Sequence, residues 1–283
     1  MTGRDRVWAA LRGEKGDRPP KGEVLIENSW LRDCGFRRLD EAVRHLGADL
    51  AVLPIRPPAG RAAFWQEWAR TGSFLWGCWQ GPITLLAEQK GWHALSRLLI
   101  KQPEEARVLM AGLLGEWVEA GLAALDGGCD GIVFFDDLAG DKGLLIHPRL
   151  LQEIYFPLVV GALERLECRK VPVIFHSDGN IQSLLGLLKS SGFWGIQGLQ
   201  PSVGLGPAAL APELDDWVFW GNFEFEGPGR LKTAGEVERE VAQLLEAWSG
   251  FPGYIFGSSG GLYKGLSLPE VKTAYDVVNS WRR

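Results

Sequence analysis

Cysteine, methionine and excess basic charge are all scarce in this chain of 283 residues. It has 4 cysteines and 2 methionines, and its 30 lysines and arginines are outnumbered by 35 aspartates and glutamates, which gives a net charge of −5. Cys34, Cys78, Cys129 and Cys168 are far apart and form no Cys-x-x-Cys pair, so they give no argument for a four-cysteine zinc site and are typical of reduced thiols. Without a basic stripe, nucleic-acid binding is not expected.

Long apolar runs and linkers are also missing. No segment has the ~20 uninterrupted apolar residues of a membrane span, and residues 1–20 are charged and lack the pattern of a signal peptide. No Pro/Ser-rich stretch or charge block divides the chain. We therefore expect a cytoplasmic protein, without a membrane partner, that forms one domain over residues 1–283.

What the sequence does contain is a recurrent short apolar run with a polar or glycine-rich end, followed by a longer helical pattern. Eight runs have the length of a strand: 22–28, 48–56, 72–81, 130–137, 171–179, 195–202, 217–224 and 253–260. Helical periodicity follows at 103–125, 148–167, 180–190, 234–248 and 269–282. Eight alternating units in a chain of this length predict a single (β/α)8 TIM barrel with an N-terminal lead-in helix. An open doubly wound sheet is the alternative, but no G-x-G-x-x-G turn follows the first run.

Polar residues gather at the ends of these runs. Because a barrel builds its active site at the carboxyl ends of its strands, these positions are the candidate site residues. They are Glu27, Asn28, Arg56, Trp79, Gln80, Asp136, Asp137, His176, Asp178, Gln200, Ser202, Asn222, Glu224, Ser258 and Ser259.

His176 and Asp178 end the apolar run "VPVIFHSDGN" and are the first candidates for catalysis. Residues i and i+2 of a strand share a side, so both side chains can act on one ligand. The alternative is a satisfied pair in which Asp178 accepts from the imidazole or caps the helix that follows. With Glu224, the pair can also supply nitrogen and oxygen ligands to a metal, or a general acid.

"FFDD" is the second candidate. Adjacent residues of a strand point to opposite sides, so one of Asp136 and Asp137 is expected to face the barrel mouth; a loop anchor or helix cap is the alternative. Arg56 can hold a substrate carboxylate or form a structural ion pair. We expect Glu27, Asn28, Gln200, Asn222, Ser258 and Ser259 to contact substrate. The glycine-rich segment 257–265 can bind an anion, or is a plain flexible loop.

In the order and spacing of several segments, the chain resembles the uroporphyrinogen decarboxylase superfamily, which includes corrinoid-dependent methyltransferases of the methylcobamide:coenzyme M type. The segments are "RDRVWAALRGEKGDRPP", "GADLAVLP", "GPITLLAEQKG", "CDGIVFFDDLAGDKGLLIHPRLLQEIYFPLV", "VPVIFHSDGNIQSLLGLLKSSGFWGIQGLQPSVG", "WGNFE" and "GYIFGSSGGLYKGLSLPEVKTAYDVV". The resemblance implies a TIM barrel, in agreement with the strand count.

Departures from the family patterns favour the methyltransferase branch. True haem-pathway decarboxylases carry an "RQAGRY"-like motif where this chain has "IENSWLRDCG", and an "NLGHGI"-like segment where it has "FGSSGGL". Zinc-thiolate methyltransferases carry His-x-Cys-Gly and a later cysteine. Here His176 matches the histidine, Asp178 stands at the cysteine position, and Ser258 or Ser259 stands near the second cysteine. Hard oxygen ligands suit an ether, hydroxyl or amine better than a thiol.

The resemblance therefore implies a methyltransferase that transfers a methyl group between a small substrate and a cobalamin carried by a corrinoid-binding partner protein. His176, Asp178 and Glu224 would activate the methyl-bearing heteroatom, with zinc or another metal as a candidate cofactor, and Asp136 or Asp137 would orient the substrate. The alternatives are decarboxylation of a tetrapyrrole or another carboxylate, and a catalytically silent ligand-binding barrel. A homodimer is compatible with either activity.

Overall fold

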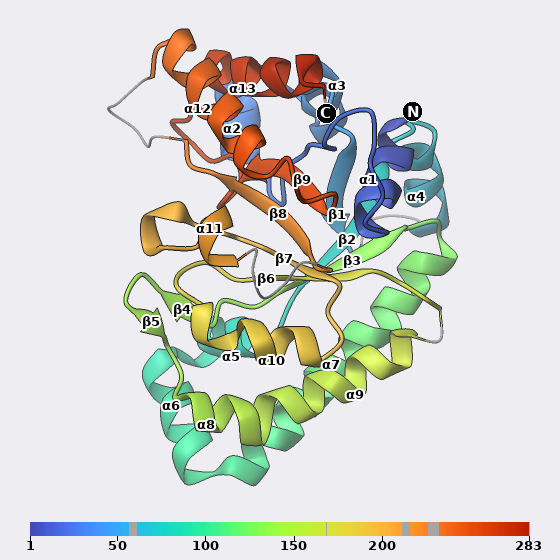
Figure 1. The fold of residues 1–283 in the computed structure, drawn as a ribbon. Helices are drawn as coiled ribbons and strands as arrows, with labels where there is room; N and C mark the ends of the chain where they lie inside the picture. Colours follow the sequence, from blue (N-terminus) through green and yellow to red (C-terminus); the bar gives the residue numbers. More distant parts are fainter. Residues whose placement is uncertain (57–60, 168, 211–215, 226–231, 283) are drawn as a thin grey trace. The chain divides into compact units, whose positions relative to one another are not determined.

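A computed structural model describes the chain except residues 57–60, 168, 211–215, 226–231 and 283 (Figure 1). Cys168 thus lies outside the described residues. The helices are α1 (Gly3–Leu11), α2 (Asn28–Asp33), α3 (Leu39–Leu46), α4 (Arg61–Ala69), α5 (Pro82–Lys90), α6 (Trp92–Lys101), α7 (Pro103–Asp126), α8 (Pro148–Leu150), α9 (Phe156–Glu167), α10 (Leu185–Ser190), α11 (Pro207–Leu210), α12 (Ala234–Ala247) and α13 (Leu268–Ser280). The strands are β1 (Leu50–Pro54), β2 (Phe74–Gln80), β3 (Gly131–Phe135), β4 (Ala139–Gly140), β5 (Gly143–Leu144), β6 (Val173–His176), β7 (Gly195–Gln197), β8 (Val218–Phe223) and β9 (Tyr254–Ser258).

The fold is α/β. Among the described residues, seven strands form one sheet in the order β1-β2-β3-β6-β7-β8-β9, and β4 and β5 form a separate two-stranded hairpin. The pairs β2–β3, β3–β6 and β8–β9 are parallel. These seven strands fall within seven of the eight predicted runs, and the five predicted helical segments are helical over most of their length. The short hairpin is an element that the sequence pattern did not predict.

The predicted first strand, 22–28, is wrong for the described residues. Its backbone forms only isolated bridges, Lys21 to Phe256 and Ile26 to Leu262. The pairing with β9 does not continue past Gly22 because the two backbone groups that would extend it bind side chains instead. The Gly22 carbonyl accepts from the Trp220 indole (2.8 Å), and the Ser258 N–H donates to Glu23 Oε2 (2.9 Å). The complete eight-stranded barrel therefore remains a prediction.

The chain divides into two compact units. The first comprises residues 1–52, 70–75 and 197–283, and the second comprises residues 53–69 and 76–196. The chain passes from one unit to the other inside β1, β2 and β7 and at the end of α4, where the sequence has no linker to mark a boundary. The prediction of one domain over 1–283 stays a prediction.

In the second unit, aromatic side chains form the core beneath β3 and β6. Phe134 contacts Trp117 edge to face, with ring centroids 4.9 Å apart, and stacks on Phe175 at 6.0 Å. Trp117 belongs to α7, which lies alongside α9 (Figure 1). Large aromatic rings contribute most of the apolar area of such a core, so this packing fixes the two strands that carry the candidate site.

The long helix α7 is the one described helix that has the length and composition to cross a membrane. Its most apolar window has a mean hydropathy of 1.5 and is 39% buried inside the structure. Core helices satisfy the same criterion, so this is weak evidence for a membrane span.

In the first unit, α12 and α13 begin at residues that the sequence marks as helix starts. Thr233 and Glu236 form a capping box at α12, and the hydroxyl of Ser267 accepts from the backbone of Glu270 at α13. Six tryptophans of the two units are fully buried: Trp30, Trp65, Trp76, Trp117, Trp220 and Trp248.

Candidate active site at the carboxyl ends of β3 and β6

The strands β3 and β6 bring the two polar motifs of the sequence to one edge of the second unit. They pair in parallel with Phe135 opposite His176, and the Asp136 N–H donates to the His176 carbonyl (2.9 Å). Because both strands end at this pair, the residues that follow, "DD" and "SDG", leave the sheet at the same place. The site prediction for this edge rests on the same geometry.

His176 is held in a fixed orientation. Its side chain is 1% exposed, and its ring stacks on that of Phe135 with centroids 3.8 Å apart and planes 20° from parallel. The Nε2 atom lies 3.8 Å from Asp137 Oδ1. The histidine thus presents one nitrogen toward a carboxylate at the edge of the sheet.

Asp178 contacts the same carboxylate through its backbone. Its N–H donates to Asp137 Oδ1 (3.0 Å), while its own Oδ1 is buried and has no hydrogen-bond partner among the described residues. Burial raises the pKa of Asp178, the nearby His176 opposes this shift, and the negative charge of Asp137 adds to it. An unsatisfied buried carboxylate oxygen costs about 1–3 kcal/mol, so this atom calls for a proton, a ligand or a cation.

Asp137, His176 and Asp178 together can hold a metal ion. Each offers one ligand atom, and these atoms all lie within 4.8 Å of one another. Neighbouring ligand atoms bound about 2.1 Å from one ion are ~3.0–3.4 Å apart, so these side chains must move closer together to bind it. The unpartnered Asp178 oxygen fits such a role. Two carboxylate oxygens and one imidazole nitrogen favour a hard or borderline divalent cation.

No thiolate belongs to this set among the residues that the structure describes. Burial raises the pKa of both Cys78 and Cys129 to about 12, which keeps the two thiols protonated at neutral pH. Cys34 lies in the other unit, and burial also raises its pKa. A soft thiolate site therefore has no counterpart in this cluster among the described residues.

Asp136 anchors the loop after β3 to the start of α5, which is the alternative role named for the "FFDD" pair in the sequence analysis. It is fully buried, and its carboxylate accepts from the backbone of Ile83 (3.2 Å) and from the backbone and hydroxyl of Thr84 (2.6 and 2.8 Å) at the start of α5. Burial raises the pKa of Asp136 to about 6, and the hydrogen bonds from Thr84 and Ile83 oppose this rise. A side chain at Gly81 would overlap this carboxylate, since a Cβ there would lie 2.3 Å from Oδ2.

Thr84 connects the anchor to the candidate metal ligands. Its hydroxyl donates to Asp136 and accepts from the Asp137 N–H (2.9 Å). Thr84 was not predicted to have a chemical role; the one available signal was a hydroxyl in the apolar run "GPITLL". Asp136 thus positions Asp137 through Thr84, while its own catalytic role stays a prediction.

The "HSDG" loop is held in place by hydrogen bonds to the segment that follows β3. The Ser177 hydroxyl accepts from the Leu138 N–H (3.0 Å) and donates to the Asp178 carbonyl (2.9 Å). Gly179 has φ 80°, and a Cβ there would lie 2.7 Å from the Ala139 carbonyl carbon. Only glycine accommodates both this backbone conformation and this close approach. The Asn180 N–H then bonds the Gly140 carbonyl (3.0 Å).

Arg56, also in the second unit, is engaged by protein groups. Its guanidinium lies 3.9 Å over the Trp79 ring and 3.4 Å from Glu116 Oε2, and its side chain is 43% exposed. The structural ion pair named as its alternative is present. A contact with a substrate carboxylate stays a prediction.

Gln80, also in the second unit, donates to Glu88 Oε1 (2.7 Å). Apart from Trp79 and Gln80, the other predicted site residues belong to the first unit. Glu224 accepts from the Ser202 N–H (3.1 Å) and hydroxyl (2.6 Å). Asn222, with φ 84°, donates to the carbonyls of Leu199 and Leu205 and accepts from the Trp248 indole. Their assigned roles as metal ligand and substrate contact stay predictions.

Glu27 precedes α2, Asn28 is its first residue, and Gln200 precedes the 3-10 turn Pro201–Val203. The Ser259 hydroxyl donates to the Leu199 carbonyl (3.3 Å). The substrate contacts predicted for these four residues also stay predictions.

Glu23 is a buried carboxylate that the sequence analysis missed. It accepts from the N–H (2.9 Å) and the hydroxyl of Ser258 and from the Tyr275 hydroxyl (2.9 Å). Burial raises the pKa of Glu23, and these hydrogen bonds oppose the rise. The hydroxyl of Ser258 is therefore already used inside the fold. A charged residue amid the apolar run "GEVLI" was the available signal.

The family comparison and two curated relatives point to the same group of proteins. A family model described as "Uroporphyrinogen decarboxylase (URO-D)" matches residues 70–281. Proteins named uroporphyrinogen decarboxylase from Geobacter sp. (strain M21) and Trichlorobacter lovleyi are 28% identical over 203 residues and 26% identical over 207 residues. These matches cover 69% and 70% of this chain but 56% and 57% of the relatives. The chain therefore spans little more than half the length of these relatives.

A solved structure gives the fold likeness. A methyltransferase from Methanosarcina mazei superposes with a TM-score of 0.80 and 16% identity, over 99% of this chain and 98% of the other. At this identity the match shows a shared fold. It leaves the reaction of this chain open.

Proposed function

Because the chain belongs to the uroporphyrinogen decarboxylase (URO-D) family, we propose that it is a methyltransferase of that family which transfers a methyl group to or from a cobalamin. The small methylated substrate would be an ether, an alcohol derivative or an amine, and the cobalamin would be carried by a separate corrinoid-binding protein. The observation that supports this best is the Asp137–His176–Asp178 cluster, whose ligand atoms lie within 4.8 Å of one another at the ends of β3 and β6. The fold likeness to a methyltransferase is consistent with it.

The ligand chemistry favours an oxygen or nitrogen methyl donor. A divalent cation held by Asp137, His176 and Asp178 would supply Lewis-acid polarisation of the heteroatom that bears the methyl group. Oxygen-rich sites prefer oxygen and nitrogen donors, whereas thiol substrates pair with softer thiolate sites. The proposed cation, zinc or a harder divalent metal, thus selects the substrate class as well as activating it.

The chain's own residues keep this cluster in place. Asp136 and Thr84 hold the backbone of Asp137, and the Gly179 turn sets Asp178 against it. In the proposed reaction, the bond between the heteroatom and the methyl carbon breaks, the electron pair of cob(I)alamin forms the cobalt–carbon bond, and the heteroatom takes a proton. Pre-set ligand positions lower the reorganisation that such a transfer requires.

The test is the formation of methylcobalamin. Purified protein is mixed anaerobically with cob(I)alamin and a panel of methoxylated and methylamine compounds, and the cobalamin spectrum is followed. We expect methylcobalamin with at least one donor, little with His176→Ala, and an unchanged rate with Asp141→Asn, an exposed carboxylate in the β4–β5 turn. No methylcobalamin across the whole panel would rule out the proposal.

Decarboxylation of a tetrapyrrole or another carboxylate is the second candidate, supported by the names of the curated relatives. In that reaction Asp136 or Asp137 would stabilise a developing cation. Incubation with uroporphyrinogen, followed by chromatography of the porphyrins, distinguishes the two proposals. Stepwise loss of carboxylates would favour decarboxylation, and full recovery of the substrate would dispose of the porphyrin version.

A further inference from the structure

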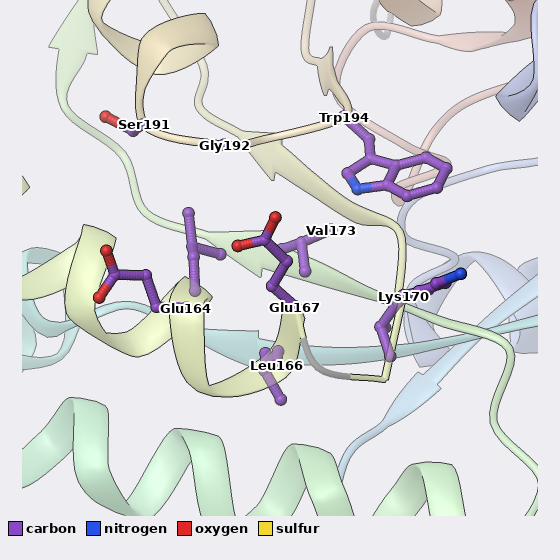
Figure 2. Close-up of a pocket in the computed structure, with 10 residues that line it drawn as sticks. Glu164, Leu166, Glu167, Lys170, Val173, Ser191, Gly192 and Trp194 are labelled. Carbon is purple, nitrogen blue, oxygen red and sulfur yellow. The ribbon is translucent and has the colours of Figure 1, made fainter.

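A cavity of about 270 Å³ lies in the second unit, away from the candidate active site (Figure 2). It is lined by the last turn of α9, by residues that lead into β6, and by residues that lead into β7. Val173 lines the cavity at the start of β6, whereas His176 ends that strand. Three residues of strand rise separate them by about 10 Å. Nothing in the proposed methyl transfer uses this cavity.

The floor of the cavity is apolar. Leu166 and Val173 line it and are 1% and 3% exposed. Ser191 also lines it, but its hydroxyl is bonded to the Leu187 carbonyl (2.7 Å). A ligand with an apolar body therefore fits the floor, and its polar group must be recognised at the rim.

The rim carries unpaired negative charge. Glu164 and Glu167 stand three positions apart on α9 and so share one face of the helix. Neither forms an ion pair within the described part of the chain, although the neighbouring Arg165 and Arg169 pair with Glu119 and Asp126. The carboxyl end of α9 adds negative potential at the same place.

Two further side chains define the ligand. In the view of Figure 2, the Trp194 indole and Glu164 stand on opposite sides of the cavity with Glu167 between them, and the Lys170 ammonium points away from both glutamates. An aromatic face attracts a cation and repels an anion. The carboxylates, the indole and the apolar floor thus all favour one ligand class.

We propose that this cavity binds an organic ammonium ion with an apolar body. The ammonium lies at the carboxylates of Glu164 and Glu167, and the body rests on Leu166 and Val173 against the Trp194 ring. A dry protein cavity of about 150 Å³ holds one benzene molecule. The space here accommodates an aromatic ring with a two- or three-carbon amine chain, so a phenylalkylamine is the matched probe.

The test is isothermal titration calorimetry of the full chain at low ionic strength with 2-phenylethylammonium chloride. The matched probes are 2-phenylethanol, which lacks the charge, and 3-phenylpropionate, which reverses it. The variant is the double substitution Glu164→Gln and Glu167→Gln, and Glu246→Gln on the exposed face of α12 is the control. Trp194→Leu tests whether the aromatic ring contributes to binding, and Trp194→Phe is the matched variant that keeps an aromatic ring.

We expect saturable binding of the ammonium probe and at least about tenfold weaker binding of the alcohol, the lower end expected for hydrogen bonds to charged groups. The double glutamine variant should bind the ammonium probe more weakly by a similar factor. Trp194→Leu should also weaken binding of this probe, whereas Trp194→Phe should retain it. Glu246→Gln should leave the affinity unchanged. Circular dichroism melts check that the variants are folded. The proposal is overturned if the wild-type chain shows no saturation up to about 20 mM probe, a weak-binding limit, or if the alcohol or the double variant binds as well.

Discussion

Replacing Thr84 by valine should destabilise the protein and loosen the candidate metal site. Valine keeps the shape of threonine but removes a hydroxyl that joins two elements. The hydroxyl donates to the buried Asp136 carboxylate (2.8 Å) and accepts from the Asp137 N–H (2.9 Å). After the substitution, Asp136 keeps its backbone donors from Ile83 and Thr84.

The magnitude follows from these two bonds. A hydrogen bond to a charged group contributes about 1.5–3 kcal/mol, and a buried N–H left without a partner costs about 1–3 kcal/mol. The more apolar valine side chain recovers part of this through burial, about 1 kcal/mol. We therefore expect the free energy of unfolding of Thr84→Val at neutral pH to fall by about 1.5–5 kcal/mol.

The loss should depend on pH. The pKa of Asp136 is raised from 3.8 to about 6 by burial, and the Thr84 hydroxyl opposes that rise, so the variant should have a still higher value. A raised carboxyl pKa means that stability is lost as the pH rises from the unfolded pKa through the folded one. The destabilisation by Thr84→Val should therefore be largest above pH 6 and smaller near pH 4, where the carboxyl is protonated.

Urea unfolding at several pH values measures the effect. The control is Thr273→Val on α13. The Thr273 hydroxyl donates to the Pro269 carbonyl at the helix surface (2.8 Å), and this substitution should change stability by less than about 0.5 kcal/mol. Equal, small effects of the two substitutions, or a loss independent of pH, would refute the assigned link through Thr84.

Three further outcomes follow from the geometry. Gly179→Ala should destabilise by about 2–3 kcal/mol, because φ is 80° and the new Cβ would meet Ala139, whereas Gly161→Ala in the open face of α9 should stabilise by about 0.5–1 kcal/mol; thermal melts compare them. Burial lowers the pKa of Lys21 from 10.5 to about 7, so the unfolded chain holds more protons in that range and stability should rise with pH from 7 to 10.5; Lys21→Met should flatten this rise in unfolding curves. Asp178→Cys should shift metal preference from manganese toward zinc and cadmium in competition titrations.

The sequence predicted the sheet well because parallel strands covered on both faces are continuous apolar runs. Seven of the eight runs are strands among the described residues. The exception, 22–28, has the same apolar pattern, but the side chains of Trp220 and Glu23 take hydrogen bonds that a strand would need. Such tertiary partners leave no local signal in the sequence.

The sequence predicted where the candidate site lies, at the strand ends, but not every residue that forms it. His176, Asp178 and the "FFDD" pair were identified because they lie at the ends of predicted strands. The alternation of side chains along a strand placed one aspartate of that pair on each face of the sheet. The structure separates them by burial, with Asp136 inside against α5 and Asp137 in the cluster. Thr84 and Glu23 were missed because a single polar residue in an apolar run gives no periodic signal.

Metal content tests the central claim most directly, that Asp137, His176 and Asp178 form one metal site. Elemental analysis compares the wild-type chain as purified with Asp137→Asn, His176→Ala, Asp178→Asn and the exposed control Asp141→Asn. The account predicts a stoichiometric divalent metal in the wild type and the control, and its loss in each of the three site variants. A wild-type chain without metal, or site variants that retain it, would contradict the account.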